Sequence, residues 1–154
     1  MSKSDNKELQ QRFVDECWNE GNTDLIDELY SENYVGHWYL LGGGDADREA
    51  LKAFIQDVRT GFPDFEMTVE FMIAEDDMVS MGFTADGTHE GEFMGIPPSE
   101  TESGTAGATP GHLTHRFEDG KIVESWSTWD ALGLLLGLGV IPEDLSAALP
   151  AADD

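Results

Sequence analysis

The chain has 154 residues, a length that suits a single domain with one hydrophobic core. It carries 32 acidic against 8 basic residues, a net charge of −24, which excludes the clustered Lys and Arg of a nucleic-acid-binding surface. No apolar run approaches the roughly 18 residues of a membrane span, and residues 1–8 lack the apolar core of a signal peptide. We therefore expect a cytoplasmic protein that binds neither nucleic acid nor membrane.

The acidic composition has two interpretations. One is a solvated surface from a salt-adapted proteome, since molar salt shortens the Debye length to about 3 Å and screens repulsion between carboxylates. The other is an acidic patch that binds cations or a partner. The single cysteine, Cys17, excludes an intrachain disulfide and is expected as a small buried hydrophobe of a predicted helix.

The N-terminal part of the chain predicts two helices. Apolar residues recur at helical spacing over residues 9–18, with Asp5 or Asn6 as the N-cap and Gly21 as the end of the helix. Residues 24–30 predict a second, short helix.

A third helix is predicted after a short aromatic segment. Residues 34–41 are apolar and aromatic and stop at the three glycines 42–44. Asp45 or Asp47 is expected to cap the helix that follows, and residues 61–63, Gly-Phe-Pro, are expected to close it.

Beyond this point the apolar period changes from helix to strand. Apolar residues stand at every second position from Phe65 to Ile73, which predicts a strand with one buried face, and residues 78–88 predict a second strand. Residues 99–110 are rich in Ser, Thr, Gly and Ala and predict a mobile loop.

The last third predicts a hairpin and a helix. Residues 112–117 and 122–129 predict two strands joined by a turn with the Asp-Gly pair at 119–120, and residues 130–140 predict a short apolar helix. Helices followed by an antiparallel sheet indicate an α+β fold. We expect one domain over residues 1–140 and a flexible acidic tail over residues 141–154.

Two segments of this region carry a resemblance to a known family. Residues 89–98 read His-Glu-Gly-Glu-Phe-Met-Gly-Ile-Pro-Pro, and residues 116–124 read Arg-Phe-Glu-Asp-Gly-Lys-Ile-Val-Glu. Together they resemble the SnoaL-like polyketide cyclases, within the wider family of cone-shaped folds related to nuclear transport factor 2. The resemblance implies a cone-shaped barrel, in which N-terminal helices pack on a curved, mostly antiparallel sheet around a pocket, and it implies a homodimer.

The resemblance also implies a chemistry. Proteins of this family close polyketide rings by intramolecular aldol reactions without a metal or organic cofactor, so a hydrophobic carbonyl substrate and no cofactor are expected here. Aligned on the second segment, the family's catalytic Asp falls on Ser127 and its His on Leu113. Neither side chain can replace those groups unaided. A non-catalytic pocket for an apolar small molecule, or an interaction protein using the open sheet face, therefore remains an alternative to an acid–base enzyme.

Three residues are candidates for the missing catalytic groups. Asp130, at the end of the last strand, is a candidate general base and equally a candidate helix N-cap. His115 shares strand parity with position 113 and should face the same side, in the pocket or at the edge of the core. His89 should lie in or beside the pocket mouth. His112 points away from His115 on a strand, so no shared metal is expected.

Further residues are expected to bind the substrate because they are aromatic or occupy pocket positions of the family. They are His37, Tyr34, Trp38, Leu113, Ser127, Trp129 and Phe93. For His37, the alternative is a buried histidine whose ring nitrogens hydrogen-bond to the backbone. Of the two tryptophans on the last strand, Trp129 shares parity with Ser127, so it is expected as a pocket wall, with plain core packing as the alternative.

Overall fold

The helices precede most of the sheet along the chain, as an α+β protein requires. The computed structural model describes residues 2–38, 44–98 and 105–141. Its elements are, in chain order, α1 (Lys3–Arg12), η1 (Phe13–Asn19), α2 (Leu25–Leu29), β1 (Tyr30–Trp38), β2 (Asp45–Ala46), α3 (Arg48–Gly61), β3 (Glu66–Glu75), β4 (Met78–Thr88), β5 (Thr105–Glu118), β6 (Lys121–Trp129) and α4 (Ala131–Gly137). The predicted fold class is confirmed.

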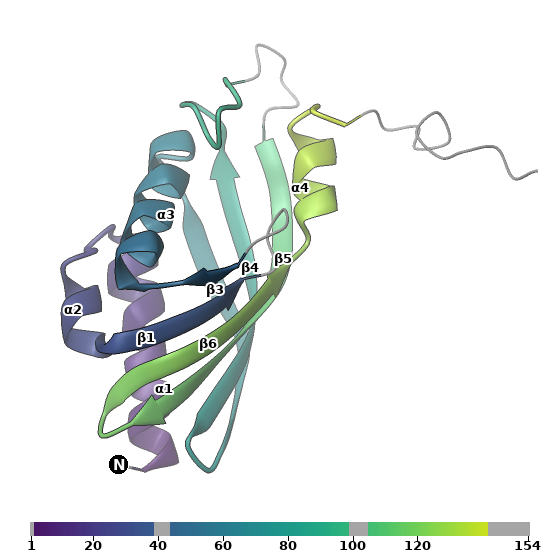
Figure 1. Cartoon of the computed structure of the whole chain (residues 1–154). Coiled ribbons are helices and arrows are strands. Elements are labelled where there is room, and N and C mark those ends of the chain that lie inside the picture. Colours follow the sequence, from purple (N-terminus) through teal and green to yellow (C-terminus); the bar gives the residue numbers. More distant parts are fainter. Residues whose placement is uncertain (1, 39–43, 99–104, 142–154) are drawn as a thin grey trace, which may run out of the picture.

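The strands form one mixed sheet in the order β2-β1-β6-β5-β4-β3. Neighbouring strands run antiparallel except β1 and β6, which run parallel. The sheet is strongly curved, with α1, α2 and α3 on one side of it and α4 beside the N-terminal part of β5 (Figure 1). The expected cone is confirmed, and it is open because β2 and β3 remain edge strands. No helix in the described ranges is long and apolar enough to cross a membrane.

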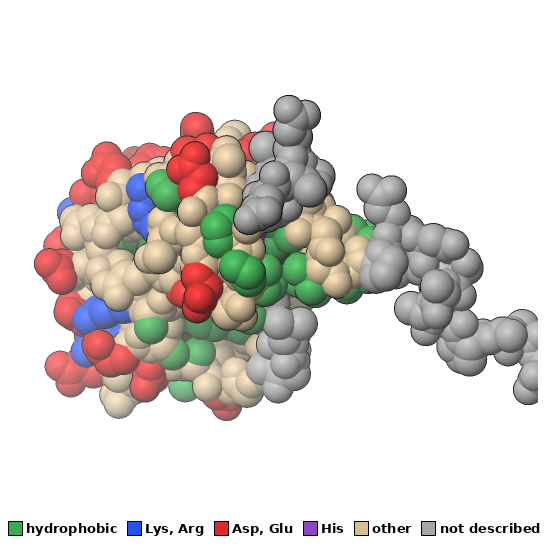
Figure 2. Space-filling model, turned by 90° about the horizontal axis from the view of Figure 1, so that it is seen from above, with side chains coloured by type: hydrophobic (Ala, Val, Ile, Leu, Met, Phe, Trp, Pro, Cys, Tyr) green, Lys and Arg blue, Asp and Glu red, His purple; other side chains and the backbone are tan. Residues whose placement is uncertain are grey.

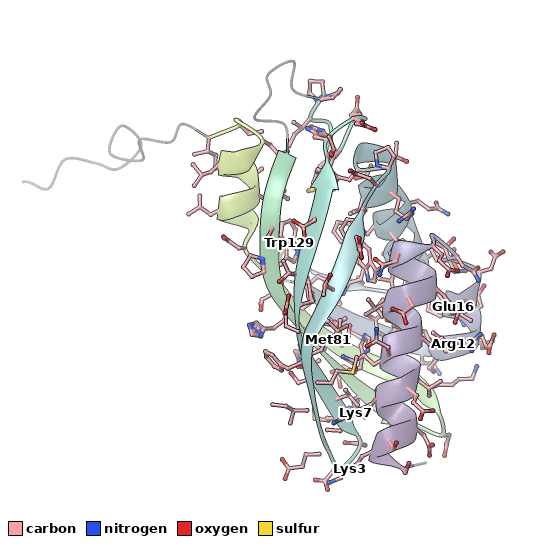
Figure 3. The ribbon with its side chains drawn as sticks, turned by 180° about the vertical axis from the view of Figure 1, so that it is seen from behind. Lys3, Lys7, Arg12, Glu16, Met81 and Trp129 are labelled. Atoms are coloured by element: carbon pink, nitrogen blue, oxygen red, sulfur yellow. The ribbon has the colours of Figure 1, made fainter. Side chains whose placement is uncertain are left out.

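The hydrophobic core lies between these helices and the inner face of the sheet. The π-helix η1 turns Phe13, Val14 and Cys17 toward the strands, where each is at most 1% exposed. They meet fully buried side chains such as Met81 of β4. The labelled Arg12 lies on the opposite, outward side of this helical segment (Figure 3). Burial also raises the pKa of the Cys17 thiol to about 12, which makes it an unreactive core residue as expected.

The helix ends agree in part with the predicted caps. The first helix begins earlier than predicted, because Ser2 and Asp5 form a capping box in which each side chain accepts from the other's backbone N–H. Ser2, and not Asp5 or Asn6, is therefore the N-cap. Gly21 adopts a φ of 77° where the predicted helix should end. Asp47 caps α3 by accepting from the N–H of Ala50 at 2.8 Å.

The alternation predicted for residues 65–73 is broken by a bulge. The register of β3 with β4 shifts between Val69 and Phe71, so Phe71 and Ile73 turn to the outer face, and Met72 and Ala74 pack against the core instead. Phe71 and Ile73 are consequently 47% and 64% exposed. Phe71 lies over Gly82, where an added Cβ would stand 2.3 Å from its ring. The strand keeps one buried face, but the prediction that Phe71 and Ile73 belong to it is wrong.

The predicted loop over residues 99–110 is partly a strand. Residues 99–104 lie outside the described ranges, but residues 105–110 belong to β5 and pair with β4. Pairing with a neighbouring strand overrides a composition that is poor in strand-forming residues. The hairpin that follows is confirmed, with φ of 51° at Asp119 and 77° at Gly120, both positive as a type I′ turn requires. Helix α4 is also confirmed, whereas residues 142–154 of the predicted tail lie outside the described ranges.

Candidate functional site

A cavity of about 110 Å³ lies between the inner face of the sheet and the helices. Side chains of η1, α3, β1, β4, β5, β6 and α4 contribute to its wall. Aromatic rings dominate that wall and are contributed by Phe13, Trp18, Tyr30, Tyr34, Trp38, Phe54, Phe62, Phe65, Phe83, Phe93 and Trp129. An apolar wall with a few polar groups is typical of small-molecule sites, although sites for drug-sized ligands are larger, at about 300–1,000 Å³.

The pairing of β5 with β6 sets the order of residues along the cavity wall, from its closed end, called here the deep end, to its open end, called the wide end. His115 lies opposite Ser125, and Leu113 lies opposite Ser127 one step further along. Trp129 follows beside the start of α4, where Figure 3 labels it. His115 and Ser125 are each 1% exposed, whereas Trp129 is only partly buried. The polar side chains of His115 and Ser125 therefore lie at the deep end, and the ring of Trp129 lies at the wide end.

Seen from above, the wide end of the molecule shows hydrophobic side chains at its centre, with acidic side chains over much of the surrounding surface (Figure 2). Exposed apolar residues of the elements at this end are Met94, Leu132 and Val140. Among the described lining residues, Asp86 of β4 is the acidic one, and it is exposed. An anionic ligand would approach this end through negatively charged surroundings.

Tyr30 and His115 form a buried polar pair at the deep end. The phenol oxygen of Tyr30 lies 3.1 Å from Nε2 of His115, and Phe13 packs edge-on against both rings at 5.4 Å. Burial lowers the pKa of His115 to about 3 and raises the pKa of Tyr30 well above its usual value. Both groups are therefore neutral near pH 7. Nδ1 of His115 has no hydrogen-bond partner among the described residues.

A second polar pair lies beside the first. The hydroxyl of Tyr34, on β1, hydrogen-bonds to the hydroxyl of Ser125, on β6. Burial raises the pKa of Tyr34, while hydrogen bonds from Ser125 and Trp38 act in the opposite direction. The deep end thus presents neutral hydroxyl, imidazole and indole groups, and the described wall includes no Lys or Arg.

His89 lies one side chain away from the cavity. It is 4% exposed and stacks at 5.2 Å on Phe62, which is part of the wall. Within the described ranges of the chain, neither of its ring nitrogens has a hydrogen-bond partner. The structure does not bring His89 into contact with His115 or Asp130, the other two candidate catalytic residues.

Asp130 is the N-cap of α4. Its carboxylate accepts from the backbone N–H of Gly133 at 2.9 Å, and an added Cβ at Gly133 would stand 2.2 Å from the other carboxylate oxygen. The side chain is exposed and does not contribute to the described wall. Of the two interpretations that the sequence left open, the geometry favours the cap over the general base.

His37 lies on the outer face of the sheet, not in the cavity where it was expected. Its Nδ1 lies 3.0 Å from Oδ1 of Asp45, and its Nε2 lies 2.7 Å from Oε2 of Glu124. Its ring stacks on that of Trp126, with 5.5 Å between the ring centroids. The hydrogen bond to Glu124 is the main cause of a raised His37 pKa. The reason for its placement is strand parity, since Tyr34 and Trp38 take the inner positions of β1.

The remaining candidates do come together on the cavity wall. They are Tyr34, Trp38, Phe93, Leu113, His115, Ser127 and Trp129. Their roles in binding or catalysis stay predictions. Sequence reasoning missed Tyr30, which was assigned to the end of a helix, and Ser125, which shares the parity of Ser127 and could have been found from it.

The described residues include no group of three or more His, Cys, Asp or Glu side chains that could hold a metal ion. His112 and His115 point to opposite faces of β5, as strand parity predicted: His112 contacts the ring of Phe71 on the outer face, and His115 lines the cavity.

Comparison with known proteins agrees with this geometry. Residues 8–138 match the sequence profile of the family described as SnoaL-like polyketide cyclase. The chain belongs to this family. No curated protein sequence matches it.

Solved structures show the same fold. AclR from Streptomyces galilaeus, a proposed hydroxylase, is 28% identical with a TM-score of 0.79 over 92% of this chain and 100% of its own. IdmH from Streptomyces antibioticus, a proposed polyketide cyclase, is 29% identical with a TM-score of 0.72 over 86% of this chain and 97% of its own. A proposed SnoaL-like polyketide cyclase from Jannaschia sp. CCS1, 24% identical with a TM-score of 0.79 over 91% of this chain and 95% of its own, shares the fold.

Proposed function

We propose that this SnoaL-like protein binds a neutral, hydrophobic carbonyl compound of polyketide type in its cavity. The observation that carries the proposal is the make-up of the wall, in which aromatic rings surround a deep end with uncharged hydrogen-bonding groups. Burying an ionised ligand without a counter-charge is costly, whereas a carbonyl needs only a hydrogen-bond donor. A neutral ligand therefore fits this wall better than a carboxylate or a phosphate.

Proton transfer to such a ligand is a second candidate function, and the Tyr30–His115 pair favours it. A neutral imidazole and a phenol can polarise a carbonyl in a dry site. The low pKa of His115 makes it a weak base, however, and the family's two catalytic positions hold Leu113 and Ser127. Binding is for this reason the primary proposal, and catalysis the secondary one.

One experiment tests both functions with acetophenone as the probe. Isothermal titration calorimetry should show saturable binding with a negative heat-capacity change, because apolar surface is buried. Proton NMR of the same mixture in D₂O measures deuterium exchange at the methyl group next to the carbonyl. Exchange that is lost in His115→Gln would support catalysis, and an unchanged ligand would support binding alone. Failure of acetophenone and similar neutral carbonyl compounds to bind would contradict the proposal.

We also propose that two copies pair through the outer face of the sheet. The exposed apolar side chains of Phe71 and Ile73 lie on this face, next to the ring of His112. Sedimentation velocity over a range of concentrations should show a dimer, and Phe71→Glu should shift it toward monomer. A monomer at all concentrations would contradict this arrangement.

The acidic surface is proposed as an adaptation to a salt-rich cytoplasm. Some of the basic residues are already engaged with carboxylates: Arg12 with Glu16 at 2.5 Å, and Lys52 with Asp27 at 2.8 Å. The excess negative charge should then repel itself at low ionic strength. The melting temperature should rise by several degrees between 0.1 and about 2 M KCl, as differential scanning fluorimetry would measure. A melting temperature independent of salt would contradict the adaptation.

A further inference from the structure

We infer that Trp38, Tyr34 and Ser125 form a row of polar groups along the cavity wall. One hydroxyl hydrogen of this row has no acceptor in the part of the chain that the structure describes and donates to the carbonyl oxygen of the ligand. This inference rests on the proposed function and names the place in the cavity where the carbonyl is held.

The row is built by two neighbouring parallel strands. Tyr34 and Trp38 flank Gly36 on β1, and Gly36 pairs with Ser125 of β6. All three side chains of the row contribute to the cavity wall. Tyr34 and Ser125 are 3% and 1% exposed, so the protein holds them in place away from bulk water.

Gly36 allows the row to form. A Cβ added there would stand 2.5 Å from the Tyr34 hydroxyl oxygen and 2.7 Å from Nε1 of Trp38, both too close for a real side chain. The two polar atoms therefore converge over the one position of β1 that has no side chain. No positive φ requires glycine at this point, so the need for it is steric.

A count of protons shows what the row lacks. The hydroxyls of Tyr34 and Ser125 supply two donor hydrogens, and the hydrogen bond between them uses one. The remaining hydrogen belongs either to Tyr34 or to Ser125. The indole N–H of Trp38 faces the same position over Gly36 and can only donate, so it does not take up this hydrogen. No further acceptor for it is present among the described residues.

The missing acceptor is expected in the cavity. A buried hydroxyl without an acceptor costs free energy, and a ligand oxygen would satisfy it. The described part of the wall includes no cation to pair with an anionic oxygen, and acidic side chains surround the wide end. The acceptor is therefore the oxygen of a neutral ketone, ester or similar carbonyl group.

The cavity volume limits the size of the group that accompanies this carbonyl. An apolar cavity of about 150 Å³ takes up benzene, whereas sites for drug-sized ligands span about 300–1,000 Å³. At about 110 Å³, this cavity is smaller than the one that takes up benzene, so it encloses a carbonyl group with a short branched chain or part of a ring. A fused-ring ligand would have to project through the wide end beside Trp129 and Asp86.

Acetophenone and α-methylstyrene provide a matched pair of probes, because a C=CH₂ group replaces C=O with little change of shape. Their affinities are measured by calorimetry for the wild type, for the double variant Tyr34→Phe/Ser125→Ala, and for Ser80→Ala. Ser80 lies on the outer face, where its hydroxyl accepts from Thr114, so it is a matched control outside the cavity. The wild type and the control should prefer acetophenone about three- to tenfold, and the double variant should lose most of that preference.

The outcomes separate this inference from the proposed function. Equal binding of both probes to the wild type would overturn the row while leaving the apolar pocket in place. Binding of neither probe would overturn the pocket itself and the row with it. Loss of the preference in Ser127→Ala, with the double variant retaining it, would place the carbonyl one step nearer the wide end and overturn the row.

A spectroscopic measurement on the wild type covers the case in which the double variant does not fold. The infrared C=O stretch of bound acetophenone should lie at a lower wavenumber than in hexane, because a hydrogen bond weakens the carbonyl bond. A bound ligand whose stretch matches that in hexane would overturn the inference.

Discussion

The inner and outer faces of the sheet are built by alternate residues of the same strands, yet they hold polar groups in opposite ways. On the inner face, His115 is buried against Phe13 and Tyr30 and is held neutral. On the outer face, His37 lies between Asp45 and Glu124, and its pKa is raised. Burial without a charge lowers a histidine pKa, and carboxylate partners raise it.

This difference separates two functions of one sheet. The outer face stabilises charge through partners, as in the ion pair in which Arg116 donates to Glu124 at 2.5 Å. The inner face excludes charge and retains neutral donors, which suits an apolar ligand with one polar group. A single-residue shift in register would exchange the two faces, so the alternation itself defines the site.

The largest expected difference between the two faces is in stability, and a matched pair of isoleucine substitutions measures it. Ile122→Ala, on the inner face, should lower the free energy of unfolding by about 2–5 kcal/mol, because Ile122 is 0% exposed. Ile73→Ala, on the outer face, should change it by less than about 0.5 kcal/mol, because Ile73 is 64% exposed. Urea denaturation of dilute protein measures both. At a concentration where sedimentation velocity shows only monomer, a cost at Ile73 close to that at Ile122 would contradict the exposed position of Ile73.

The next effect concerns the pH dependence of the two histidines. His115 has a folded pKa of about 3, below the ordinary 6.5, so the unfolded chain binds a proton that the native state does not. The stability contributed by neutral His115 is complete above pH 6.5 and falls by about 1.4 kcal/mol per unit below it, or about 2 kcal/mol at pH 5. His115→Gln should remove that loss, as urea denaturation between pH 5 and 8 would measure.

His37 should act with the opposite sign. Its folded pKa is raised, so its contribution is complete below the unfolded pKa and is lost as the pH rises through the folded pKa. His37→Gln should therefore flatten the stability curve on the alkaline side, by a smaller amount because the side chain is partly exposed. Identical pH profiles for the two variants would contradict the contrast between the faces.

Periodicity made most of the fold predictable. The amphipathic face of α3, the Asp-Gly hairpin turn and the α+β order follow from local patterns that tertiary packing reinforces. The bulge after Val69 was not predicted, because a bulge depends on pairing with β4, although Met72 and Ala74 already interrupt the apolar alternation in the sequence. Ser2 was overlooked as a cap although it forms a capping box with Asp5, a pattern that the sequence contains.

The site was predictable only where strand parity governs it. Parity placed Trp129, Ser127 and His115 on one face, as the structure has them. It was not applied to β1, so His37 was assigned to the wrong face. Tyr30 could not be found in this way, because the boundary between α2 and β1 falls immediately before it. Whether a polar group is neutral or charged depends on neighbours that are distant in sequence, and a local sequence pattern does not reveal them.

The smallest effect decides between the two interpretations of Asp130. If the carboxylate acts only as the N-cap of α4, Asp130→Ala should lower the free energy of unfolding by about 1 kcal/mol, and Asp130→Asn should lower it by only a few tenths. Neither variant should change acetophenone affinity or the deuterium exchange measured by NMR. A general base would give the reverse pattern, since Asn preserves the cap but cannot accept a proton. Exchange abolished in Asp130→Asn, with stability intact, would place the carboxylate in the chemistry despite its exposed position at the end of β6.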